Sequence, residues 1–269
     1  MHLLKTNIIQ KLNLNKFRTM QNFSRRTKIY SATSAAIYDE GLRQYFLRIY
    51  TLMSIGLAIT AISAFSVFSI PMLTSLMFNV TPGGHVIGMT SIGWLVTVMP
   101  IGISLYFTFG LDRISTQNAQ ILFWVYATLM GMSISSLGFV YTGASITKTF
   151  LICSSMFGGM SLYGYNTKKD LTSMGSFLFM GLMGLVIASL INILFRSPAI
   201  EFALSFLGVV IFTGLIAYDT QKLKSLYYQG ADSNDKIGVM AAFTLYLDFI
   251  NLFIYLLRFF GEKTNDQKK

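Results

Sequence analysis

The stretch VMAAFTLYLDFINLFIYLL, from Val239 to Leu257, decides the fold class of this chain. It carries a single formal charge, at Asp248, and consists otherwise of mainly aliphatic and aromatic residues. A helix of about 20 such residues matches the thickness of the hydrocarbon core of a bilayer. A carboxylate near the middle of such a helix costs about 2.5–3.5 kcal/mol, so Asp248 is a candidate functional group that needs a partner.

Further apolar runs of similar length occur along the rest of the chain. With the last one in its full extent, they are Ile49–Phe68, Val86–Gly110, Ile121–Tyr141, Thr149–Tyr165, Phe177–Phe195, Phe202–Tyr218 and Ile237–Phe260. No run alternates with period two, which argues against a transmembrane barrel. Helices satisfy their own backbone hydrogen bonds in lipid. We therefore predict an all-α membrane protein with seven transmembrane helices.

The composition agrees with a lipid environment. Hydrophobic residues make up 53% of the 269 residues and charged residues 12%, with a mean hydropathy of +0.57. An average soluble domain has roughly 25% charged residues, so we expect the lipid bilayer to surround much of this chain. The net charge of +10 lies in one tail and in short gaps between the apolar runs. This distribution argues against nucleic acid as a partner.

Charge also divides the chain into three parts: a basic N-terminal tail (1–40), the transmembrane domain (41–261) and a polar C-terminal tail (262–269). Nine of the 21 Lys and Arg residues precede residue 49, which predicts a cytoplasmic N-terminus. We expect this tail to be poorly ordered and close to anionic lipid head groups. Alternatively, it is a transit peptide, which would place the protein in the mitochondrial inner membrane. The side of the C-terminus and the choice between Met1 and Met20 as the start stay open.

The partner of Asp248 is predicted to be Asp219. If the sixth helix continues to about Tyr228 and the seventh begins near Lys236, Asp219 lies about 13 Å before the turn and Asp248 about 18 Å after it. The two carboxyl groups then have comparable depths and can meet. Alternatively, Asp248 only forms a hydrogen bond across helices, and Asp219 is a residue at the membrane edge that pairs with Lys222 or is solvated.

Two polar residues share the helical face of Asp248, and they are predicted to support it. Thr244 lies four residues before it and Asn251 three residues after it. Two carboxylates close together in a low dielectric cannot both ionise easily, so they share a proton. Such a pair is a proton-sensitive latch that holds the helices together until both charges develop. Carboxylate oxygens suit Ca²⁺, but Asp219 and Asp248 alone would make a weak, transient metal site, so no resident cofactor is expected.

Four stretches of the chain resemble the Bax-inhibitor-one family. They are SLYGY with TKKDL (Ser161–Leu171), SMGSFLFMG (Ser173–Gly181), GLIAYDTQ (Gly214–Gln221) and LYLDFINLF (Leu245–Phe253). The resemblance is closest to the bacterial inner-membrane branch and covers about Gly41 to Gly261. It implies a seven-helix bundle with the last helix near its centre, and a proton-sensitive calcium leak whose dyad is Asp219 and Asp248.

The resemblance also implies a latch at Arg113. In a bacterial relative, a basic residue after the second helix closes the dyad, and gap-free spacing back from Gly131 places Arg113 at that position. That relative has an acidic residue in its second helix, whereas Val86–Gly110 contains no charge.

These observations predict a pH-gated passive calcium leak in the bacterial inner membrane. One alternative is a regulatory membrane protein that binds another membrane protein, such as a protease or a stress factor. Another is an aspartyl intramembrane protease, whose dyad activates water. The second aspartate here lies in Tyr-Leu-Asp-Phe-Ile-Asn rather than Gly-x-Gly-Asp, and we therefore expect no enzymatic activity.

Overall fold

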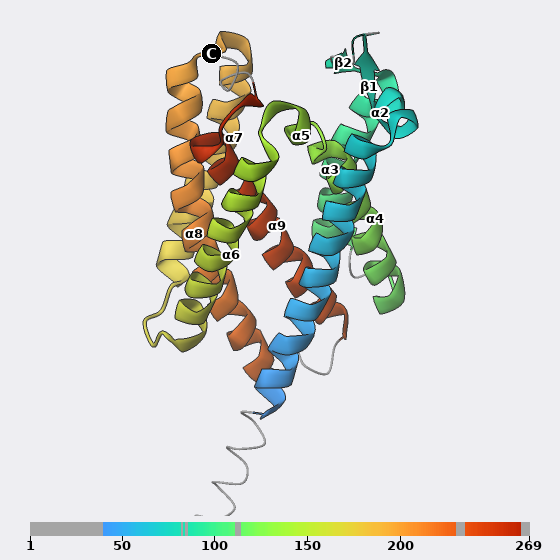
Figure 1. Ribbon diagram of the computed structural model, residues 1–269. Coiled ribbons are helices and arrows are strands. Elements are labelled where there is room, and N and C mark those ends of the chain that lie inside the picture. The colour runs from blue at the N-terminus through green and yellow to red at the C-terminus, as the bar shows by residue number, and fades with distance from the viewer. Residues whose placement is uncertain (1–39, 82, 84–85, 111–113, 230–234, 265–269) are drawn as a thin grey trace, which may run out of the picture. The chain divides into compact units, whose positions relative to one another are not determined.

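The computed structural model is α-helical apart from a small hairpin (Figure 1). It describes residues 40–81, 83, 86–110, 114–229 and 235–264. The predicted basic tail therefore lies outside the described residues, except for Glu40. The chain divides into two compact units, Met1–Leu47 and Arg48–Lys269, and each is described by itself.

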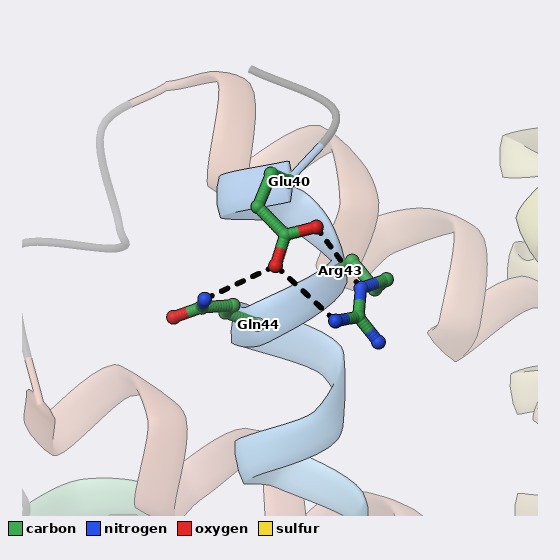
Figure 2. Close-up of polar contacts among 3 residues, drawn as sticks. All are labelled: Glu40, Arg43 and Gln44. Atoms are coloured by element: carbon green, nitrogen blue, oxygen red, sulfur yellow. Dashed lines mark hydrogen bonds and ion pairs between the residues drawn. The ribbon is translucent and has the colours of Figure 1, made fainter. Parts of the chain in front are cut away.

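In the first unit, the described residues begin a helix at Glu40. The Glu40 carboxylate accepts hydrogen bonds from Arg43 Nε at 3.1 Å, from Arg43 Nη2 at 3.2 Å and from Gln44 Nε2 at 3.1 Å (Figure 2). Side chains three and four residues apart are neighbours on a helix, and an acid in the first turn also interacts favourably with the helix dipole. These local contacts favour a helix start at Glu40.

Six helices of the described residues are long and apolar enough to cross a bilayer. They are Glu40–Ser69, α3 (Ser91–Gly110), Thr116–Val140, α7 (Thr172–Phe195), α8 (Pro198–Tyr228) and α9 (Asp235–Phe260). They correspond to six of the seven predicted runs, so the prediction of an all-α membrane protein is confirmed at this level. The remaining run lies in α6 (Gly143–Asn166), which is 24 residues long but less apolar, with buried polar residues such as Ser145, Thr149 and Ser161.

The run Val86–Gly110 was predicted as one helix, and its first residues are instead a strand. Strand β2 (Val86–Met89) pairs antiparallel with β1 (Phe78–Val80), which follows the short helix α2 (Pro71–Met77). The Thr90 hydroxyl accepts a hydrogen bond from Gly93 N at 3.0 Å, so α3 begins after Thr90. A short apolar segment has no periodicity that distinguishes strand from helix, which is why the prediction was wrong here.

The next two predicted boundaries also differ from the structure. The run Ile121–Tyr141 comprises α4 (Thr116–Ile134) and a separate single turn, α5 (Leu137–Val140). Helix α6 begins at Gly143, six residues before the predicted Thr149, because the Thr142 hydroxyl caps it by accepting from Ser145 N at 3.2 Å. The polar residues of the first turns hide this start from a search for apolar residues.

The last helix, α9, is the most buried of the candidate spans. In the apolar 18-residue stretch of α9, 67% of the residues are buried, compared with 11–39% in the corresponding stretches of the other spans. It packs against α8, α6 and α4, and the ring of Phe243 stacks on Phe107 of α3 at a centroid distance of 4.3 Å. At the same level the hydroxyl groups of Thr60 and Tyr246 are 2.6 Å apart. Helix α9 is therefore the core element of the second unit.

Helices α8 and α9 form an antiparallel hairpin, and α8 (Pro198–Tyr228) extends beyond both ends of the predicted run Phe202–Tyr218, as supposed for its second end in placing Asp219 opposite Asp248. Helix α8 ends at Tyr228 and α9 begins at Asp235. Over its 26 residues α9 is continuous and about 39 Å long, which exceeds the roughly 30 Å of a bilayer core.

Beyond α9, residues 261–264 form a segment that we call the C-terminal strap. It lies along the start of α6, where Thr142 N donates to Glu262 O at 3.1 Å and Glu262 N donates to Ser145 Oγ at 3.0 Å. Tyr141 and Lys263 form an antiparallel bridge beside these bonds. The first residues of the predicted polar C-terminal tail are thus fixed to the start of α6.

Candidate functional site: an intramembrane carboxyl pair

Asp248 lies in the middle of α9 and is only 5% exposed. The residues on either side of it, Leu247 and Phe249, are apolar. Oδ2 of Asp248 has no hydrogen-bond partner among the described residues. A buried polar atom without a partner costs free energy, so its presence in a core helix calls for an explanation beyond packing.

Asp219, on α8, faces Asp248. The side chains of the two aspartates share a hydrogen bond and interact electrostatically. A hydrogen bond between two carboxyl groups requires a proton on one of them, since an ionised carboxylate has no donor. The structure therefore brings together the two residues that the sequence singles out, and their contact requires at least one proton on the pair.

Close packing of α8 against α6 positions Asp219. A Cβ atom at Gly164 would lie 2.2 Å from Ala217 O, so only glycine allows the two helices to approach this closely. Three residues from Ala217, Thr220 Oγ1 lies 3.1 Å from Ser161 Oγ, which in turn bonds the hydroxyl of Tyr50. These contacts hold one side of α8 against α6 and leave Asp219 directed at α9.

Polar side chains of α8 also bind the turn between α6 and α7. Gln221 Nε2 donates to Lys169 O at 2.7 Å, and Gln221 Oε1 accepts from Leu171 N at 2.9 Å. One turn further, Lys224 Nζ donates to Tyr165 O at 2.8 Å. The end of α8 that follows Asp219 is therefore fixed by bonds to backbone groups of its neighbours.

The predicted supporting residues do not bond the pair. Thr244 Oγ1 donates to Met240 O at 3.1 Å and Asn251 Nδ2 donates to Leu247 O at 2.8 Å, each one turn back in α9. The predicted latch residue, Arg113, lies outside the described residues.

One cation does act on the pair, because Lys222 interacts electrostatically with Asp219. Its ammonium group also lies 5.9 Å from the centre of the Tyr218 ring. The alternative in which Asp219 pairs with Lys222 is therefore compatible with its contact to Asp248.

Sequence reasoning missed the chain of hydroxyl groups formed by Tyr50, Ser161 and Thr220. Ser161 and Thr220 are buried, and both lie in stretches that carry the family resemblance. The position of Thr220, directly after Asp219, could have indicated that it belongs to the site. A hydroxyl residue in an apolar helix is nevertheless common, because it can bond its own backbone.

The carboxyl pair can bind protons and hard cations. Among the described residues, no group of three or more His, Cys, Asp or Glu side chains could hold a metal ion. Cys153 is buried, with Sγ 3.6 Å from Phe249 O of α9. Two carboxyl groups can bind a proton between them, or a cation transiently once both are ionised.

A bundle with six helices that are long and apolar enough to cross a bilayer, among the described residues, defines a multi-pass membrane protein, here with two carboxyl groups in contact between α8 and α9. The family model described as "Inhibitor of apoptosis-promoting Bax1" matches residues 42–265. The chain belongs to this family, the Bax inhibitor-1 family, and the predicted resemblance is confirmed.

Similar proteins occur in several bacteria. An uncharacterized protein of Rickettsia prowazekii is 51% identical over 240 residues, which cover 88% of this chain and 98% of that protein. An uncharacterized protein of Caulobacter vibrioides is 42% identical over 226 residues, 83% of this chain and 90% of that protein. Inner membrane protein YbhL of Escherichia coli is 40% identical over 228 residues, 83% of this chain and 93% of that protein.

Proposed function

We propose that this protein is a pH-sensitive calcium leak of the bacterial inner membrane, gated by Asp219 and Asp248. The observation that carries the proposal is the contact between two carboxyl groups in the interior of an apolar helix pair. Ionisable residues at this depth are costly, and they mark ion or proton pathways by default. Transport is favoured over hydrolysis because Asp248 lies outside the Gly-x-Gly-Asp sequence of aspartyl intramembrane proteases.

The proton that the pair shares sets the direction of the pH response. While one proton remains, the hydrogen bond links α8 to α9 and the pathway is closed. When the pH rises enough to remove it, two negative charges a few ångströms apart repel each other strongly in a low dielectric. The helices then separate, and water or a cation enters. Two carboxylates bind Ca²⁺ too weakly for storage, which suits passage.

The proposal includes seven crossings with the N-terminus in the cytoplasm. Helix α6 is 24 residues or about 36 Å long, enough to cross a bilayer. Its first turns contact the end of α9 through Ser145 and Glu262, and Cys153 contacts Phe249, so α6 and α9 are antiparallel. The buried hydroxyl groups of α6 lower its hydropathy without shortening it. The C-terminal strap then lies on the side opposite the N-terminus.

Lysines support this orientation. The α6–α7 turn and the ends of α8 and α9 near it lie at one end of the second unit, and they carry Lys168, Lys169, Lys222, Lys224 and Lys236. Cytoplasmic loops carry an excess of basic residues, so this end faces the cytoplasm.

Calcium flux into proteoliposomes, measured against pH with an enclosed indicator dye, tests the proposal. The wild-type flux is expected to rise with pH, and Asp248→Asn and Asp219→Asn are expected to lose this dependence. Asp170→Asn is the matched control, because Asp170 is an exposed loop residue at the cytoplasmic end. Unchanged flux and pH response in both dyad variants would refute the proposal.

Asp170 suits this purpose because its charge does not change in the assay range. Its carboxylate accepts hydrogen bonds from the Thr172 hydroxyl at 2.6 Å and from Thr172 N at 2.9 Å. These bonds favour the charged form and lower the pKa of Asp170 below its ordinary value. Asp170 therefore stays ionised at neutral and alkaline pH, and the asparagine change there tests only for nonspecific effects of the substitution.

A further inference from the structure

A large apolar cavity lies in the second unit, and neither Asp219 nor Asp248 lines it. It has a volume of about 600 Å³ and is lined by residues 57–68 of the first helix, 134–138 at the end of α4, 143–150 of α6 and 249–257 of α9. Pockets that hold organic ligands have volumes of about 300–1,000 Å³. The cavity is therefore large enough for a specific occupant.

The lining is mostly apolar and contains three hydroxyl groups. All the lining residues are described, and their hydroxyl groups bond backbone carbonyls. Ser135 Oγ donates to Met132 O at 2.6 Å, and Thr147 Oγ1 donates to Gly143 O at 3.0 Å. Thr60 Oγ1 lies 2.9 Å from Ala127 O. A buried water needs two to four polar partners, so a cavity in which the donors of the few hydroxyl groups are already used suits an apolar occupant better than water or a cation.

The cavity opens onto the surface that faces lipid. Phe65 of the first helix and Phe150 of α6 line it and are also 69% and 45% exposed. Both residues lie on membrane-crossing helices, and the sides of such helices are covered by acyl chains. The cavity is thus continuous with the protein–lipid interface.

The length of the cavity matches one leaflet. Along α9 it extends from Phe249, directly after Asp248, to Leu257 near the end of the helix. Eight residues of helix are about 12 Å long, close to half of the roughly 30 Å hydrocarbon core. An acyl chain that enters from the leaflet on the C-terminal side of α9 would fill this half and stop beside the carboxyl pair.

We infer that this cavity is a binding site for one acyl chain of a bilayer phospholipid. The chain enters between the first helix and α6 and packs on the outer half of α9. The site is independent of the proposed calcium leak, because no lining group takes part in the carboxyl pair. Its ligand is recognised by shape and apolar contact alone.

Photolabelling in proteoliposomes tests this inference. A phospholipid with a photoactivatable group in its acyl chain is irradiated, and the labelled peptides are mapped by mass spectrometry. We expect stronger labelling around Ala64 and Phe253 than at Phe179, which faces lipid on α7. A photoactivatable free fatty acid is the second probe, and labelling of the cavity by the fatty acid but not by the phospholipid would overturn the assignment to a phospholipid.

Two substitutions fill or enlarge the site. Ala64→Trp fills the cavity and is expected to reduce its labelling several-fold without changing the labelling of Phe179. Ala203→Trp, on an exposed position of α8, is the matched control and is expected to change neither. Phe68→Ala enlarges the cavity and should keep or increase the labelling, which separates loss of the site from loss of the fold.

Three further results would overturn the inference. The first is equal labelling of the cavity and of Phe179 in the wild type. The second is cavity labelling that persists in correctly folded Ala64→Trp. The third is strong marking of Phe253 by hydroxyl radicals generated in water, which would mean that the cavity is hydrated.

Discussion

The close contact between α6 and α8 leads to a prediction for Gly164→Ala. The new Cβ would lie 2.2 Å from Ala217 O, whereas ordinary contact begins near 3.4 Å, so the helices must separate by about 1 Å. Overpacking of this kind costs about 1–3 kcal/mol, and the higher helix propensity of alanine offsets up to about 1 kcal/mol of that cost. A net loss of about 1–2 kcal/mol is expected.

The same displacement reaches the carboxyl pair. Ala217 precedes Asp219 by two residues, and Thr220 bonds Ser161 of α6 at 3.1 Å. A shift of about 1 Å breaks that bond and changes the position from which Asp219 meets Asp248. The pH response of the flux is therefore expected to change together with the stability.

Thermal unfolding in detergent, followed by tryptophan fluorescence, measures the stability. For a protein of this size a loss of 1–2 kcal/mol lowers the melting temperature by about 2–8 °C. Gly159→Ala is the matched control on the same helix, because no atom lies within 4 Å of its new Cβ. It is expected to be neutral or slightly stabilising. A Gly164→Ala protein that melts at or above the temperature of Gly159→Ala would contradict this account of the packing.

Three further predictions concern hydrogen bonds made by side chains. Tyr246→Phe removes the bond to Thr60 and is expected to cost about 1–2 kcal/mol in thermal unfolding, since the buried Thr60 oxygen loses its donor. Gln221→Ala removes both bonds to the α6–α7 turn, so limited trypsin cleavage at the lysines of that turn is expected to accelerate. Ser145→Ala removes the acceptor of Glu262 N, and faster deuterium uptake is expected in the C-terminal strap.

Each of these variants has a control that makes the same chemical change at another position of the described helices. Tyr126→Phe makes the same chemical change as Tyr246→Phe without the bond to Thr60, and similar losses in both would argue against that bond. Gln120→Ala should leave trypsin cleavage of the α6–α7 turn unchanged. Ser155→Ala removes an exposed hydroxyl of α6 that bonds only its own helix, so strap exchange should stay at the wild-type rate.

The sequence predicted the parts of the fold that depend on hydrophobicity and turn chemistry. The start of α9 at Asp235 lies within two residues of the predicted run Ile237–Phe260, whereas the amphipathic end of α8, from Asp219 to Tyr228, is not part of an apolar run and was only supposed to be helical. The start of α3 could not be predicted, because it depends on the pairing of β1 with β2 and on the cap at Thr90. The predicted run for α6 began six residues too late, at Thr149. Its polar first turns form hydrogen bonds to the C-terminal strap, which lies close to them only in the folded protein.

The sequence singles out the charged residues of the candidate site, but it does not indicate the geometry that small groups make around them. Asp248 is recognisable because a carboxylate in an apolar run is costly, and Asp219 follows from its depth in the hairpin. The bond between Ser161 and Thr220 depends on how closely α6 approaches α8, and no local pattern encodes that distance. The apolar cavity has no sequence signal either, because its lining residues resemble those that face lipid anywhere else.

The central position of α9 has a consequence for biosynthesis. This helix is the most buried of the described spans, and it follows the other five in the chain. Until it inserts, the earlier helices lack their shared core, and Asp219 lacks its contact with Asp248. Assembly of the bundle therefore waits for α9, and a chain truncated before Asp235 is expected to leave apolar surface without its packing partner.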